Sequence, residues 1–153
     1  MLYALLFAAA TTLAPVLSST ATWLNSAHAP AQDGRVAVVD VFTFDCINCK
    51  HVTPELHKLR SQYSESEVLI VGVHAPETPY ERDGANLRSA LQEQKITWPV
   101  IVDNDFALWK AYDVSAWPTQ LIFDRHGKLR ATYVGEGNDA EVEHTVKTLL
   151  AER

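Results

Sequence analysis

The stretch from Val36 to Cys49 reads Val-Ala-Val-Val-Asp-Val-Phe-Thr-Phe-Asp-Cys-Ile-Asn-Cys, and the rest of the fold can be worked out from it. Its first nine residues are apolar except for Asp40 and one threonine, which is typical of a strand whose two faces are both covered. The chain's only two cysteines, Cys46 and Cys49, follow directly and open a predicted helix. The positive end of a helix stabilises a thiolate, so this pattern predicts a dithiol redox site.

The remaining pattern alternates strands and helices and then closes with a hairpin and a last helix. A bend is expected at Pro54 inside the first helix, and a loop through Pro76 and Pro79 follows the second strand. This order predicts an α/β fold with a central mixed sheet and helices on both faces. The expected strands are 35–44, 68–73, 100–102, 119–123 and 129–134, and the expected helices are 46–63, 86–94, 105–112 and 139–151.

Length and charge restrict the class of protein. A chain of 153 residues with 47% hydrophobic content supports one compact domain and leaves no room for a second sizeable one. The net charge of −6 disfavours a nucleic-acid surface, which needs a basic face. Both cysteines belong to one motif, so no structural disulfide is expected elsewhere.

The first 17 residues carry no charged side chain, which is typical of the apolar part of an export signal, although a leader usually begins with Lys or Arg. Cleavage after Ala21 is expected, with Ala29 as a second position, and an uncleaved membrane anchor is also open. Either arrangement puts the domain outside the cytoplasm, in the periplasm or anchored facing it. The alternative is an apolar N-terminal helix packed on the domain. The expected division is a signal peptide or anchor over 1–21, an N-terminal extension over 22–34 and a domain over 35–153.

The two cysteines have different expected roles. Cys46, at the exposed edge of the helix, would attack a disulfide as a thiolate, and Cys49, one turn deeper, would resolve the mixed disulfide. Asp40 lies six residues before Cys46, so it points to the same side of the sheet, beneath the helix start. A carboxyl buried there has a raised pKa and can relay the proton of Cys49. The alternative for Asp40 is a capping or solvated strand-end residue.

Trp117 and Pro118 stand just before the strand expected at 119–123. A proline at the start of a strand is commonly an edge or turn feature. A cis peptide bond there, facing the dithiol, would leave a backbone edge open for an extended substrate segment. Trp117 then lines the substrate groove or, alternatively, only packs in the fold.

These features resemble the thioredoxin fold over residues 35–153, and more narrowly the TlpA-type extracytoplasmic branch, closest to the thioredoxin-like domains of DipZ-type proteins. The resemblance implies that Pro118 is cis, that Cys46 and Cys49 form a redox-active disulfide with Asp40 beside them, and that about residues 75–97 are the insertion of this branch. Glu77 loosely matches an acidic active-site residue of TlpA-type reductases, with a solvated loop carboxylate as the alternative. The motifs that carry the resemblance are Thr43–Cys49, Val71–His74, Asp103–Trp109, Trp117–Thr119, Gly135–Gly137 and, before the first strand, Trp23–Ser26.

The sequence also departs from that family. Val41 and Phe42 stand where relatives usually carry an aromatic pair, and Asp45 replaces a neutral or aromatic residue just before Cys46. A carboxylate beside the nucleophile disfavours its thiolate and makes the disulfide form relatively more favourable, which argues for a reductant. A potential nearer about −270 mV than about −120 mV is therefore expected.

Three other functions compete with this hypothesis. Cys-x-x-Cys is half of a metal-ligand set, but there is no second cysteine pair and only His51 is near, so no metal or other cofactor is expected. Thr43 and Cys46 have the Thr-x-x-Cys spacing of a thiol peroxidase, although Val39 occupies the position of its usual proline. A non-catalytic binding domain that keeps the fold is the third.

We therefore expect an exported or membrane-tethered thiol-disulfide oxidoreductase that reduces protein disulfides through Cys46 and Cys49. In an oxidising compartment such a reductant needs electrons from across the membrane, for example from a DsbD/CcdA-type transporter. The expected protein is a monomer with no nucleic-acid partner.

Overall fold

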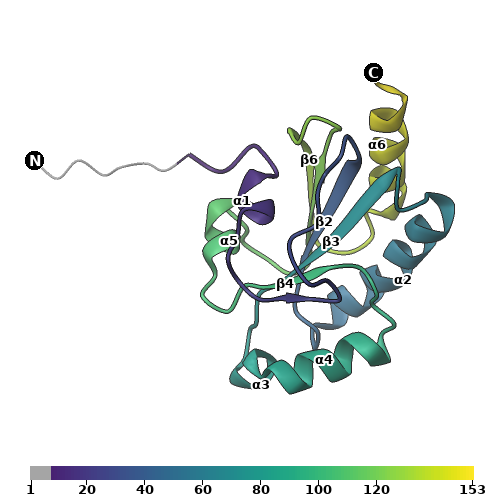
Figure 1. Ribbon diagram of the computed structural model, residues 1–153. Coiled ribbons are helices and arrows are strands. Elements are labelled where there is room, and N and C mark those ends of the chain that lie inside the picture. The colour runs from purple at the N-terminus through teal and green to yellow at the C-terminus, as the bar shows by residue number, and fades with distance from the viewer. Residues whose placement is uncertain (1–7) are drawn as a thin grey trace, which may run out of the picture.

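The computed structural model describes residues 8–153, which form a six-stranded sheet with helices on both faces (Figure 1). The strand order is β1-β4-β3-β2-β5-β6, with β4, β3 and β2 parallel to one another and β1, β5 and β6 antiparallel to their neighbours. This confirms the predicted mixed sheet. The strands are β1 (Trp23–Leu24), β2 (Val36–Phe42), β3 (Val68–His74), β4 (Val100–Val102), β5 (Thr119–Phe123) and β6 (Leu129–Val134).

Each face of the sheet is covered by its own set of helices. Side chains of α2, α4 and α6 join the hydrophobic cluster on one face, and those of α1 and α5 join the cluster on the other. Figure 1 shows α2 and α6 on one side of the sheet and α1 beside α5 on the other. The helices are α1 (Ala14–Leu17), α2 (Ile47–Gln62), α3 (Pro79–Arg82), α4 (Gly84–Glu93), α5 (Ala107–Ala111) and α6 (Asp139–Ala151).

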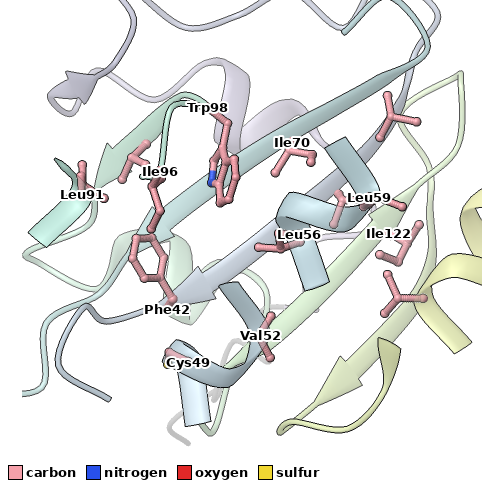
Figure 2. Close-up of a cluster of buried hydrophobic side chains, with 14 of the residues drawn as sticks. Phe42, Cys49, Val52, Leu56, Leu59, Ile70, Leu91, Ile96, Trp98 and Ile122 are labelled. Atoms are coloured by element: carbon pink, nitrogen blue, oxygen red, sulfur yellow. The ribbon is translucent and has the colours of Figure 1, made fainter. Parts of the chain in front are cut away.

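Strand β2 is buried along its whole length, and its residues contribute alternately to the two clusters. Val36, Val38 and Phe42 face α2, whereas the odd-numbered residues between them face α1 and α5, because successive side chains of a strand point to opposite faces. On the α2 side, Val52 and Leu56 belong to the same cluster as the sheet residues (Figure 2). Asp40 shares the even-numbered face and so lies on the side of α2, as the sequence predicts.

The N-terminal segment is packed on the domain. Leu13 and Val16 are buried in the cluster on the α1 face, and the backbone of Thr11 and Leu13 pairs with Leu129 and Gly127. Strand β1 pairs with β4, so the sheet begins before residue 35, where the domain was expected to start. Residues 1–7 of the expected leader lie outside the described residues.

Processing after Ala21 remains a prediction, with a structural consequence: it would take Leu13 and Val16 out of the core. Within residues 8–153, no helix combines the length and the apolar character needed to cross a membrane.

Helix α3 was expected to be loop, and it forms because its N-terminus is well capped. The Thr78 side chain accepts a hydrogen bond from the backbone of Glu81, whose carboxylate accepts in return from the backbone of Thr78. Pro79 occupies the first turn, where a missing N–H costs nothing. Asp83 then ends α3 and caps α4, so that α4 begins at Gly84, two residues earlier than expected.

Candidate active site

Cys46 is the N-cap of α2. Its backbone is extended, with φ −76° and ψ 125°, and its Sγ accepts a hydrogen bond from the backbone N–H of Cys49 at 3.2 Å. The side chain takes the place of the Ser or Asp oxygen that usually caps a helix, so the sulfur lies at the positive end of α2. Cys46 is half-buried, and both cysteines are free thiols.

Cys49 lies one turn deeper and is only 3% exposed, in the cluster between α2 and the sheet (Figure 2). Burial raises the pKa of its thiol, and the hydrogen bond to the Cys46 sulfur and the charge of Asp40 raise it further. The two sulfurs are therefore inequivalent, since one is accessible at a helix end and the other is held neutral in the core.

Asp40 is 4% exposed beneath α2, which corresponds to the expected buried carboxyl rather than to a capping or solvated residue. Burial raises its pKa from 3.8 to about 7, and the charge of Glu55 adds to the effect. Its Oδ1 is buried and has no hydrogen-bond partner among the described residues. A carboxyl with this pKa can take up and release a proton near neutral pH, and its charge reaches Cys49.

The Trp117–Pro118 peptide bond is cis, as the family resemblance implies. Thr119 pairs with Val41, so Pro118 stands beside the end of β2, where the chain leaves the sheet for the cysteines. The Trp117 indole N–H donates to the carbonyl of Ala75 at 2.8 Å. The ring is half-buried, with its centroid 4.4 Å from that of Trp109. Trp117 is thus anchored by packing and keeps part of its surface open.

Glu77 is exposed, as the alternative of a solvated loop carboxylate predicts. The buried acid of this loop is Glu81, which is 2% exposed and accepts hydrogen bonds from the backbone of both Glu77 and Asp45. Glu81 was absent from the sequence-based candidates. The signal that could have found it is the Thr-x-x-Glu capping box that begins at Thr78.

Asp45 precedes the nucleophile and is exposed, but its carboxylate forms an ion pair with Lys50 at 3.0 Å. Its negative charge is therefore partly offset, although the sequence alone suggests an unpaired carboxylate.

The residues of the competing functions have other partners. The Thr43 hydroxyl is buried and lies 3.3 Å from Nε2 of His74. The imidazole of His51 is exposed and pairs with Glu136. Within residues 8–153, no group of three His, Cys, Asp or Glu side chains is arranged to hold a metal ion.

Comparison with known proteins agrees with this geometry. The sequence profile of Redoxin matches residues 9–150. NHL repeat-containing protein 2 of Bos taurus is 40% identical over 131 residues, 82% of this chain and 18% of that protein. Protein DipZ of Mycobacterium tuberculosis is 30% identical over 142 residues, 90% of this chain and 20% of that protein, which confirms the resemblance to DipZ-type proteins. The chain spans about a fifth of the length of these relatives.

A solved structure extends the comparison to the whole fold. The structure of a thiol-disulfide isomerase from Corynebacterium glutamicum superposes with a TM-score of 0.77 at 26% identity, covering 86% of this chain and 92% of that one. The fold is therefore thioredoxin-like, and the chain belongs to the Redoxin family.

Proposed function

We propose that this protein is a thiol-disulfide oxidoreductase that reduces disulfides of polypeptide substrates through Cys46 and Cys49. The observation that carries the proposal is the inequivalence of the two sulfurs. Cys46 is accessible at the start of α2, whereas Cys49 is buried one turn below it, with its backbone N–H bonded to the Cys46 sulfur. Attack and resolution require this division of roles.

The reaction then runs in two exchanges. The Cys46 thiolate attacks one sulfur of the substrate disulfide, forms a mixed disulfide and releases the other sulfur as a thiolate, which is protonated. Cys49 transfers its proton to the Asp40 carboxylate and attacks the Cys46 sulfur. The second substrate sulfur leaves as a thiolate and is protonated from solvent, and Asp40 returns its proton to solvent. The protein is left with a Cys46–Cys49 disulfide. Two electrons have passed from the protein to the substrate.

The residue before the nucleophile supports the reducing direction. A carboxylate beside a nucleophilic thiol favours the disulfide over the dithiol form, which lowers the reduction potential. Asp45 stands in this place, and its ion pair with Lys50 offsets part of its charge. The raised pKa of Cys49 has another effect, because it keeps this thiol neutral until Cys46 has attacked.

The surface around the site supports a polypeptide substrate. The large hydrophobic side chains that are exposed among residues 8–153 are Ile47, Tyr80 and Val134, with exposed fractions of 68%, 60% and 54%. Ile47 follows Cys46, and the Tyr80 ring packs edge-on against that of Phe44. Val134 pairs with Thr119, the residue after Pro118. Exposed apolar side chains on the segments that flank the dithiol and Pro118 suit the side chains of an unfolded or extended chain.

The electron donor and the location belong to the same proposal. After each turnover the disulfide must be reduced again, and a membrane transporter of the DsbD/CcdA type would supply the electrons in an oxidising compartment. The export signal expected at the N-terminus would put the domain in such a compartment. Cell fractionation together with N-terminal sequencing of the purified protein tests this part.

The test of the function is reduction of insulin by the full chain in dithiothreitol, with Cys46→Ser as the inactive control. We expect wild-type activity, none with Cys46→Ser, and a glutathione-equilibrated potential nearer about −270 mV than about −120 mV. A potential above roughly −160 mV would exclude a reductant. Equal insulin reduction by Cys46→Ser and the wild-type protein would exclude dithiol chemistry altogether.

A further inference from the structure

Glu81 is a buried carboxylate that the proposed thiol chemistry does not use. Its Oε2 accepts hydrogen bonds from the backbone N–H groups of Glu77 and Thr78, both at 2.8 Å, and from the Thr78 hydroxyl at 3.2 Å. Its Oε1 is turned the other way and accepts from the backbone N–H of Asp45 at 3.3 Å. One carboxylate therefore joins α3 to the residue before Cys46, 36 positions away in the chain.

This carboxylate is ionised without a cationic partner. Burial opposes ionisation, but hydrogen bonds from the Thr43 hydroxyl, from the backbone of Thr78 and Glu77 and from the Thr78 hydroxyl outweigh it, so the pKa of Glu81 lies below its usual value. No Lys, Arg or His among residues 8–153 forms an ion pair with it. Capping α3 uses only one of the two oxygens, which leaves the contact to Asp45 unexplained by the helix.

The segment that Glu81 reaches is the link between β2 and the nucleophile. The Phe44 N–H and the Thr43 hydroxyl both lie 3.3 Å from Nε2 of His74, at the end of β3. The Asp45 N–H goes to Glu81, and the Cys46 N–H donates to the carbonyl of Thr43 at 3.4 Å. Every backbone N–H group from Phe44 to Cys46 is therefore held by a hydrogen bond.

We infer that Glu81 is a positioning residue that holds Asp45, and through it Cys46, in the N-cap geometry needed for attack. The inference rests on the proposed function, because it concerns the rate at which Cys46 reacts with a disulfide. Glu81 touches no reacting atom. It acts through the backbone of Asp45, and helix α3 holds its carboxylate at that position.

Two variants separate positioning from charge. Glu81→Gln removes the charge, and its single amide oxygen can no longer serve both Asp45 and the α3 N–H groups. Glu81→Asp keeps the charge but is one methylene shorter, so it cannot span α3 and Asp45 together. Glu93→Gln is the matched control, since it removes an exposed carboxylate from α4, the helix that follows α3.

The measurement is the single-turnover rate at which the pre-reduced full chain reduces insulin, from about pH 5 to about pH 9. We expect the rate on the high-pH plateau to fall by about tenfold or more in Glu81→Gln and Glu81→Asp, because small misplacements of reacting groups are costly. The plateau of Glu93→Gln should stay within about twofold of wild type. Hydrogen exchange of the Asp45 amide should accelerate in both Glu81 variants and not in the control.

The outcomes distinguish this inference from its alternatives. A shifted pH midpoint with an unchanged plateau in Glu81→Gln, and a wild-type profile in Glu81→Asp, would mean that only the charge matters and would overturn positioning. A wild-type plateau in both variants, with only a lower unfolding midpoint, would reduce Glu81 to a helix cap. If Glu81→Gln does not fold, Glu81→Asp alone decides. An inactive wild-type chain would instead contradict the proposed function.

Discussion

Replacing Asp40 with Asn should stabilise the reduced protein progressively as the pH rises. The pKa of Asp40 is raised from 3.8 to about 7 in the folded state. Between these values the folded state holds a proton that the unfolded state has lost, so stability falls as the pH rises. Each tenfold change in proton affinity corresponds to about 1.4 kcal/mol, so the ionised carboxyl costs about 4 kcal/mol above pH 7. Asn carries no such cost.

In the wild-type protein this fall in stability with pH is masked, because the shifted pKa of His74 makes stability rise with pH. Burial lowers the pKa of His74 from 6.5 to about 4, and the charge of Glu81 only partly opposes this. Between these values the unfolded state holds the proton, so stability rises with pH by about 3 kcal/mol in total. Over about pH 4 to 6.5 the two contributions offset each other. In Asp40→Asn the free energy of unfolding should therefore rise with pH because of His74. In His74→Gln it should fall with pH because of Asp40.

The assay is urea unfolding of the reduced chain, kept reduced by a phosphine, at several pH values from about 4 to about 8. The informative quantity is the difference in unfolding free energy between Asp40→Asn and wild type, since the cost of burying the new amide does not depend on pH. We expect this difference to grow by about 3 to 4 kcal/mol across the range. Growth of less than about 1 kcal/mol would refute the burial argument for Asp40.

Three further predictions concern the resolving thiol and the core. Cys49→Ser should accumulate a mixed disulfide with its substrate, seen as a dithiothreitol-sensitive band on a non-reducing gel, and absence of the band would contradict the resolving role. Leu13→Ala should lower the unfolding free energy by about 2 to 5 kcal/mol in urea denaturation, whereas the exposed control Thr11→Ala should change it little. In Gly72→Ala the new Cβ would lie 2.9 Å from the Phe42 ring. It should therefore cost about 1 to 3 kcal/mol by the same assay, and a neutral effect would show that the ring can move freely.

Much of the fold could be predicted because its signals are local. Strand β3 and helix α6 follow from an unbroken apolar run and from apolar residues at helical spacing, and both signals lie within a single element. The segment containing Leu13 and Val16 is different. Export signals and core segments are both apolar, because the side chains of both are removed from water, into a membrane or into the protein interior. Composition alone therefore does not distinguish them. Their burial depends on α5 and on the hairpin of β5 and β6, which come later in the chain.

The same distinction between local signals and contacts made by distant parts of the chain applies to the candidate site. The roles expected for Cys46, Cys49 and Asp40 rest on spacing within one strand and one helix, and spacing is visible in a sequence. Glu81 could not be recognised as buried, because its burial depends on α3 folding against the segment before Cys46. A carboxylate among Pro, Glu and Arg residues looks solvated until the contact is known.

The position of Asp40 beneath the dithiol follows from the same pattern that builds the sheet. Asp40 pairs with Gly72 on one side and with Gln120 on the other, so β2 is held in register by two neighbours. A slip of one residue would turn Asp40 toward α1 and α5 and bring valines under Cys49. Gly72 has no side chain, and the Phe42 ring occupies the space that a Cβ would need. The packing of this ring therefore also depends on the register between β2 and β3. The apolar residues that cover both faces of β2 make it a central strand, and the same register places a titratable carboxyl near the buried cysteine.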